Sequence, residues 1–215
     1  MNASEPPSAD MIPTNSLRPP FDSVTICLHW ATVLIVLAMF TSAWLRSQSQ
    51  DDAFKVVLLQ IHRTLGVTIW VTTGFRLAWR LTNAKLPPFP ATMTKAHRTV
   101  VQWSEYGLYA LLLVQPVTGM GATLSNGRPF ALFLWRIQPL VTEDKALSAT
   151  FHLAHEIGAW ALAALVAGHA AAALVHHFVL GDDVLECMAP VITPTRCTEE
   201  FIPGGVRGEG NIEAR

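Results

Sequence analysis

The chain has 215 residues, of which 51% are hydrophobic and only 14% are charged. In a soluble globular domain roughly a quarter of all residues are charged. This composition therefore predicts an integral membrane protein that is surrounded by membrane lipid. The formal net charge of −1 gives no general attraction for nucleic acid, which we exclude as a partner.

The two ends of the chain differ from its middle. Residues 1–20 are polar and contain five prolines. They lack the basic start and apolar core of a signal peptide, so we expect a disordered tail there. Residues 191–215 are polar and rich in glycine, which predicts a second flexible tail. The membrane domain then covers residues 21–190.

Four apolar stretches follow one another within this domain, over residues 24–45, 58–81, 100–124 and 151–180. Each is long enough to cross a bilayer as an α-helix, which takes about 20 residues. We therefore expect an all-α fold, in which four antiparallel helices form a bundle in the membrane.

Basic residues indicate the orientation of the bundle. Five of them, and no acidic residue, lie in and beside the connection between the second and third stretches: Arg76, Arg80, Lys85, Lys95 and Arg98. Basic clusters favour the cytoplasmic side, so both termini are expected there too. On the opposite side, residues 129–135 are apolar and aromatic but too few to span. We expect them to lie on the membrane interface or to fold over the mouth of the bundle.

Two histidines share one face of the fourth stretch. His155 and His169 are 14 residues apart, which returns them to nearly the same face about 21 Å apart along a helix. His62 is expected at the depth of His155, and His29 at the depth of His169. Ionisable residues inside a membrane helix are usually functional. Two opposed imidazoles at each level are the ligand set of a b-type haem.

Other interpretations of the histidines remain. Each could be a structural histidine that bonds a backbone carbonyl. A zinc site could begin at His152 and His155, but it needs three or four ligands at one level. The sequence has no Cys-x-x-Cys-His motif for covalent haem attachment. Because two pairs match in depth, we favour haem.

Glycines and arginines near the histidines fit a porphyrin. Gly66 and Gly158 lie one turn from His62 and His155 and would offer the ring a flat patch, although small residues also serve helix packing. Three arginines, Arg63, Arg76 and Arg80, are placed to pair with haem propionates. The alternative is that they reach lipid phosphates.

His176 follows His169 by seven residues and is expected at the membrane interface. There it could donate a proton to a quinone headgroup. It could instead replace His169 as a ligand, or be a solvated interfacial histidine. His97 lies in the basic connection and is expected to be solvated.

Several segments resemble the bacterial cytochrome b561 family, and the resemblance covers about residues 21–190. The matching segments are Cys27–Trp30, Ile61–Gly66, Phe75–Arg80, Leu113–Gly119, His155–Glu156 and Gly168–His177. The resemblance implies that His29, His62, His155 and His169 ligate two haems b in a bacterial inner-membrane protein. Residues Trp103–Tyr106 stand where some relatives have a histidine, so any role of that histidine is not expected here.

The family resemblance and the histidine pairs together predict a function. We expect transmembrane electron transfer between an outer-face donor, a small molecule such as superoxide or a protein, and ubiquinone or a similar quinone. The protein would then be an oxidoreductase-type electron carrier. The alternative is an anchor cytochrome for a peripheral dehydrogenase or hydrogenase. A non-redox metal transporter is disfavoured, because the spans offer few carboxylates.

Overall fold

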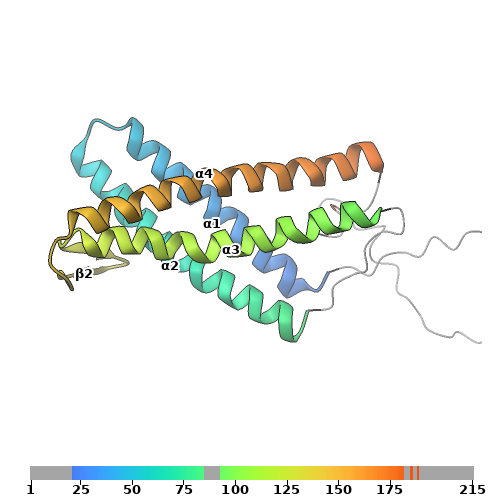
Figure 1. Cartoon of the computed structure of the whole chain (residues 1–215), viewed down its shortest axis with the longest axis horizontal. Coiled ribbons are helices and arrows are strands. Elements are labelled where there is room, and N and C mark those ends of the chain that lie inside the picture. The colour runs from blue at the N-terminus through green and yellow to red at the C-terminus, as the bar shows by residue number, and fades with distance from the viewer. Residues whose placement is uncertain (1–20, 85–92, 182–184, 186–187, 189–215) are drawn as a thin grey trace, which may run out of the picture.

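The computed structural model describes residues 21–84, 93–181, 185 and 188. Four long helices follow in chain order: α1 (Ser23–Gln48), α2 (Asp52–Thr82), α3 (Lys95–Ser125) and α4 (Lys145–Val175), which continues as the π-helix η1 (His176–Leu180). Figure 1 shows the antiparallel arrangement. All four helices are long and apolar enough to cross a membrane. The predicted all-α membrane bundle is therefore confirmed; the two tails and Lys85 lie outside the described residues.

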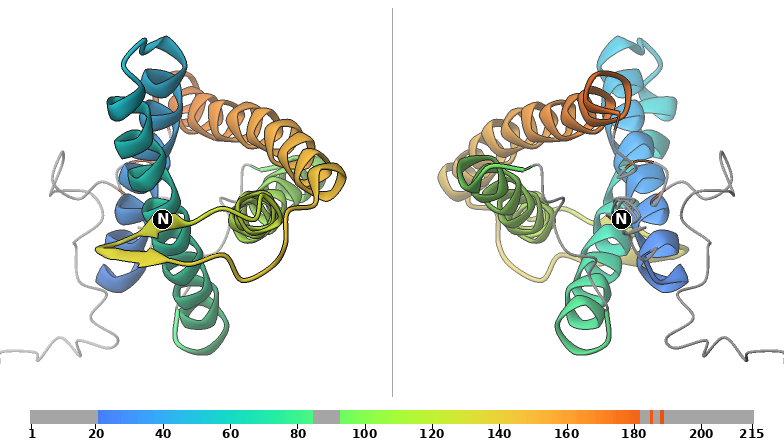
Figure 2. Two further views of the ribbon diagram at one scale, coloured as in Figure 1. Left: turned by 90° about the vertical axis from the view of Figure 1, so that its left-hand side faces the viewer. Right: turned by 90° about the vertical axis from the view of Figure 1, so that its right-hand side faces the viewer.

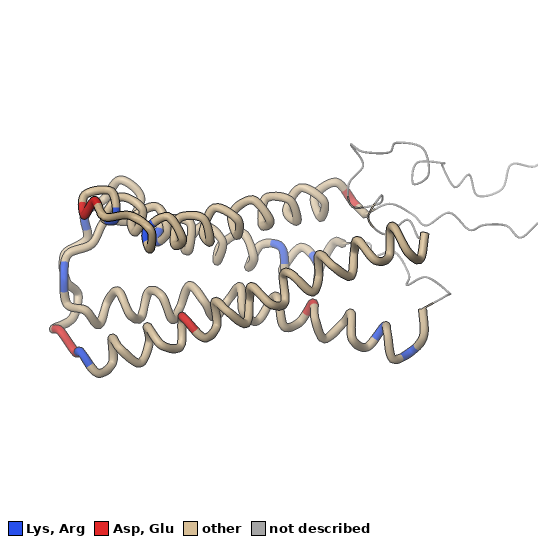
Figure 3. The backbone as a smooth tube through the Cα atoms, turned by 90° about the horizontal axis from the view of Figure 1, so that it is seen from above, with Lys and Arg blue, Asp and Glu red and all other residues tan. Residues whose placement is uncertain are grey.

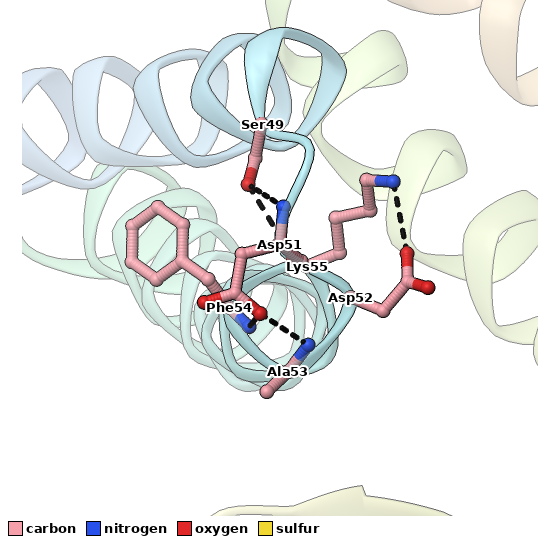
Figure 4. A network of polar contacts seen from close by, with 6 residues as sticks. All are labelled: Ser49, Asp51, Asp52, Ala53, Phe54 and Lys55. Atoms are coloured by element: carbon pink, nitrogen blue, oxygen red, sulfur yellow. Dashed lines mark hydrogen bonds and ion pairs between the residues drawn. The ribbon is translucent and has the colours of Figure 1, made fainter.

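The helices extend beyond the apolar stretches because their capping residues lie further out. At the turn between α1 and α2, the carboxylate of Asp51 accepts the backbone N–H of Ala53 at 2.9 Å. Asp51 in turn donates its own N–H to the Ser49 hydroxyl at 3.1 Å, and Lys55 pairs with Asp52 at 3.0 Å. Figure 4 shows this network. Such a cap satisfies N–H groups that the first turn leaves unpaired.

The bundle has two distinct ends. At the hairpin end lie the α1–α2 turn (residues 49–51) and a β-hairpin between α3 and α4. At the terminal end α1 begins and α4 finishes. Seen along the bundle, α1 lies beside α2 and α3 beside α4 (Figure 2), and α2 also packs on α3.

The β-hairpin was not expected from the sequence. Strands β1 (Phe130–Leu132) and β2 (Trp135–Ile137) pair antiparallel, with Phe130 opposite Ile137. The hairpin folds against α2, where the backbone N–H of Phe133 donates to the Thr64 hydroxyl at 3.0 Å. The predicted apolar segment is thus attached to the bundle, while its tip residue Leu134 is 97% exposed.

The outer surface of the bundle is apolar, as lipid requires. Leu34, Val71 and Trp160 are 65%, 61% and 73% exposed on three different helices. Most charged residues lie toward the two ends, with long uncharged stretches between them (Figure 3). Lipid-facing apolar side chains and charged ends are the pattern of helices that span a bilayer.

One apolar layer crosses the middle of the bundle. It consists of one buried residue from each helix: Val36, Ile69, Leu112 and Leu162. Leu162 is seven residues from His155 and seven from His169, which is about 10 Å along the axis from either histidine. We call these four residues the middle layer. It separates two levels of the bundle and is the main apolar contact among all four helices.

Shortening a middle-layer side chain should destabilise the bundle. Leu162→Ala leaves a cavity and should lower the free energy of unfolding by about 2 kcal/mol or more. The matched control is Leu153→Ala on the same helix, where the side chain is 57% exposed. Thermal unfolding of both variants in one detergent measures the difference. Equal midpoints would show that the layer does not hold the helices together.

Candidate functional site

The structure brings the predicted histidines together in two pairs. At the hairpin end, the rings of His62 from α2 and His155 from α4 have centroids 6.1 Å apart, with planes at 88°. At the terminal end, the rings of His29 from α1 and His169 from α4 have centroids 6.3 Å apart, with planes at 55°. The pairs are those that helix depth predicted, and the same helix contributes one member to each.

The spacing within each pair fits an axially ligated haem. Two metal–nitrogen bonds of roughly 2 Å, together with the distance from each nitrogen to the centre of its imidazole ring, would place the two ring centroids about 6 Å apart. Both observed separations, 6.1 Å and 6.3 Å, match this value. Histidines that served only to bond local carbonyls would have no reason to repeat this spacing at two levels.

The hairpin-end histidines are oriented by groups on their Nδ1 side. Nδ1 of His62 lies 3.2 Å from the Met39 carbonyl oxygen. Nδ1 of His155 lies 3.0 Å from the Gln115 carbonyl oxygen and 3.2 Å from the Thr118 hydroxyl. An Nδ1–H that donates to a carbonyl leaves Nε2 unprotonated, which is the form that binds a metal. The surrounding helices therefore hold both rings in the ligating tautomer.

His29 is held differently. The guanidinium of Arg76 donates to its Nδ1 at 3.3 Å, so the proton of this imidazole belongs on Nε2. Metal binding by His29 through Nε2 would require the other tautomer, with Arg76 turned away from Nδ1. Its partner His169 is exposed. The terminal-end pair thus has a ring spacing that fits a haem, while one of its two histidines accepts a hydrogen bond from Arg76.

A cavity of about 510 Å³ surrounds the hairpin-end pair, within the range of ligand pockets. Its lining includes both histidines together with Gly66, Gly119, Arg46 and Arg63. A Cβ on Gly119 would lie 3.0 Å from Cε1 of His155, so glycine makes room for the ring there. A Cβ on Gly158 would instead meet the Gln115 side chain. Gly158 therefore serves the packing of α4 on α3, the alternative considered for it.

The three predicted arginines lie in different surroundings. Arg63 lines the cavity, donates to the Thr123 hydroxyl at 3.3 Å and sits over the Phe130 ring of the hairpin. Arg76 reaches His29 and lies 5.5 Å from the ring centre of Tyr109. Arg80 forms an ion pair with the carboxylate of Glu105.

Arg80 forms a two-pronged ion pair with Glu105 across α2 and α3, at 3.1 Å and 2.8 Å. Glu105 stands in the segment where some relatives have a histidine. Sequence reasoning missed this pair, and also Arg46 in the cavity lining, because nothing in the local pattern identifies partners on other helices. Of the three arginines, Arg63 and Arg76 remain the better placed for a propionate.

His176 is buried at 6% exposure, and its Nε2 lies 3.2 Å from Nε2 of His97. The expectation that His97 lies in the connection before the third helix is wrong: it lies in the first turn of α3, and its side chain is partly exposed. The ring of His176 lies against that of His97, with centroids 4.9 Å apart, whereas the ring opposite His29 is that of His169.

A zinc centre finds no support. Within the described ranges, no three His, Cys, Asp or Glu side chains come together in a way that could hold a metal ion. His152 and His155 are thus not joined by further ligands there. Pairs of opposed imidazoles, without a third ligand, fit a planar macrocycle rather than a tetrahedral metal site.

The chain is similar to known membrane cytochromes. A family model described as prokaryotic cytochrome b561 matches residues 20–190. "Cytochrome b561 homolog 2" of Escherichia coli (strain K12) is 27% identical over 77% of this chain and 88% of its own length. "Cytochrome b561 homolog 1" of the same strain is 29% identical over 79% and 97%. "Probable superoxide oxidase CybB" of Yersinia pestis is 28% identical over 79% and 96%.

Filling the space at Gly119 should disturb the hairpin-end pair alone. In Gly119→Val the new side chain meets the ring of His155, so the haem content per purified chain should fall below that of the unchanged protein. The control is Gly74→Val, because no atom lies within 4 Å of a Cβ at that position. A reduced-minus-oxidised difference spectrum measures haem, and full haem content in Gly119→Val would contradict this account of the cavity.

Proposed function

The chain belongs to the prokaryotic cytochrome b561 family, and from this membership we propose that it holds two haems b and passes electrons between a donor at the hairpin end and a quinone at the terminal end. Transmembrane electron transfer and haem b binding are the properties of the family. The number of haems, their ligands and the two partners are our proposal.

The observation that carries the proposal is the repeated spacing of opposed imidazoles, 6.1 Å for His62 with His155 and 6.3 Å for His29 with His169. The two histidine pairs would hold the haems, which would supply one-electron chemistry there. The chain's own contribution is to hold the rings: Met39, Gln115 and Thr118 orient His62 and His155, and Arg76 contacts His29. The middle layer keeps the space between the two levels apolar.

We place the terminal end in the cytoplasm. Arg76, Arg80, Lys95 and Arg98 lie at or near this end, on the described parts of α2 and α3. Basic residues beside membrane spans favour the cytoplasmic side. The hairpin end then faces outward, and the quinone is reduced near His176 on the cytoplasmic side.

Superoxide is the donor that the hairpin end fits best. Arg46 and Arg63 line the cavity around His62 and His155, and two guanidinium groups raise the local concentration of a small anion. The relative from Yersinia pestis carries the name of a superoxide oxidase. In the overall reaction two superoxide ions lose one electron each and become oxygen, and one quinone takes both electrons with two protons to become quinol.

The second candidate is an anchor cytochrome for a peripheral dehydrogenase or hydrogenase. It would use the exposed apolar tip of the β-hairpin, where Leu134 and Trp135 are 97% and 73% exposed, as part of a docking surface. This function requires a partner protein, so the purified chain alone would not transfer electrons from superoxide to quinone.

Single ligand substitutions should remove the haems one at a time. His155→Ala should lose the haem at the hairpin end, and His169→Ala the haem at the terminal end. The purified protein should contain two haems per chain and each variant one, with different residual spectra. The control is His177→Ala, which removes a histidine of η1 that belongs to neither pair and does not line the cavity. Two haems in either ligand variant would refute the assigned pairs.

The donor is tested by turnover of the purified, haem-loaded chain. Superoxide generated in the presence of a short-chain ubiquinone should be consumed with formation of quinol, faster than in protein-free controls. In preparations matched for haem content, Arg63→Gln should slow haem reduction by superoxide several-fold while leaving reduction by an uncharged quinol unchanged, because only the attraction for anions is lost. If the chain does not catalyse quinol formation, superoxide is not its donor, and the anchor function is favoured.

A further inference from the structure

Two imidazoles meet at the terminal end, away from both haem-ligand pairs. Nε2 of His97 and Nε2 of His176 are 3.2 Å apart, and the ring centroids are 4.9 Å apart with planes at 38°. At this separation one Nε2 carries a proton and donates it, and the other accepts it. Two residues 79 positions apart in the chain are thereby joined through a single proton.

The two rings differ in their access to water. His97 lies in the first turn of α3, where its backbone N–H donates to the capping Thr94 hydroxyl at 3.3 Å, and it is partly exposed. His176 is only 6% exposed. The pair therefore leads from the aqueous surface into the bundle.

A change of helix type accompanies the burial of His176. At this residue α4 becomes the π-helix η1, and two residues further on Phe178 is 76% exposed. A π-helix widens the turn and re-aims side chains, and such segments are frequent at functional sites. The irregular turn thus coincides with a buried titratable side chain in contact with a second one.

We propose that His97 and His176 form a proton relay that supplies the quinone site, an inference that rests on quinone reduction at the terminal end. His97 takes a proton from water on Nδ1 and gives its Nε2 proton to Nε2 of His176. His176 then transfers its Nδ1 proton to a quinone oxygen, where an O–H bond forms, and re-equilibration of the ring protons restores the starting tautomers before the second transfer. Each quinone takes two electrons and two protons, so the relay operates twice for each quinol.

A purely structural role for the contact makes a different prediction. If the hydrogen bond only ties α3 to α4, glutamine at position 97 would preserve function, because its amide can also donate and accept. A relay needs a group that binds and releases a proton near neutral pH, which imidazole does and an amide does not. External imidazole could replace the missing ring in a relay, but it could not restore a helix contact.

The test follows reoxidation of the haems, so that it does not depend on the donor. Purified, haem-loaded protein in lipid nanodiscs is reduced with one electron equivalent of dithionite per haem, so that no reductant remains. It is then mixed rapidly with a short-chain ubiquinone. The variants are His97→Gln, His97→Ala with and without imidazole in the buffer, His176→Gln, and the double variant. His177→Gln is the matched control, since it removes the adjacent imidazole, which packs on Phe178.

If the relay operates, His97→Gln slows reoxidation of the haems by quinone about tenfold or more and leaves the haem spectrum unchanged. Imidazole restores His97→Ala, the double variant is no slower than His176→Gln, and His177→Gln reacts normally. Normal reoxidation in His97→Gln, or no rescue by imidazole, overturns the relay. If His176→Gln is slow while His97→Gln is normal, the quinone assignment stands without the relay; if both are normal, the quinone site at His176 is wrong as well.

Discussion

The position of two histidines on one face of α4 constrains the whole structure. His155 and His169 lie 14 residues apart, so any helix that meets one of them must reach a defined depth. α2 meets the first with His62 and α1 meets the second with His29. The packing of α4 against α3 supplies the carbonyl that orients His155. The depths at which α1 and α2 meet α4 are consistent with opposed imidazoles at two levels.

Apolar side chains fill the space between the two histidine pairs. The middle layer takes one apolar side chain from every helix, at a position where the bilayer offers no water. It leaves the polar groups of the bundle near the two levels and the two ends. A membrane bundle gains little from hiding apolar surface, since lipid is equally apolar, so close packing and polar contacts carry the specificity. The contacts of Gln115 and of Arg80 with Glu105 are of this kind.

Much of this arrangement was visible in the sequence. Apolar length predicted all four helices, and helix periodicity predicted both histidine pairs, because these features depend on a single chain segment and a fixed rise per residue. The β-hairpin was missed because its strands have three residues each and no turn signal at Phe133, which has a φ of 52°. The Arg80–Glu105 and His97–His176 contacts were missed for another reason. Each joins two helices, and the rotation of one helix against another is set by packing rather than by local sequence.

The hydrogen bond from Arg76 to His29 also links helices. Arg76 lies on α2 and His29 on α1, and the same guanidinium lies 5.5 Å from the ring centre of Tyr109 on α3. One cation thus contacts side chains from two other helices at the level where α1 meets α4. Any change at this position is therefore shared by three helices, which makes the terminal end of the bundle depend on a single side chain.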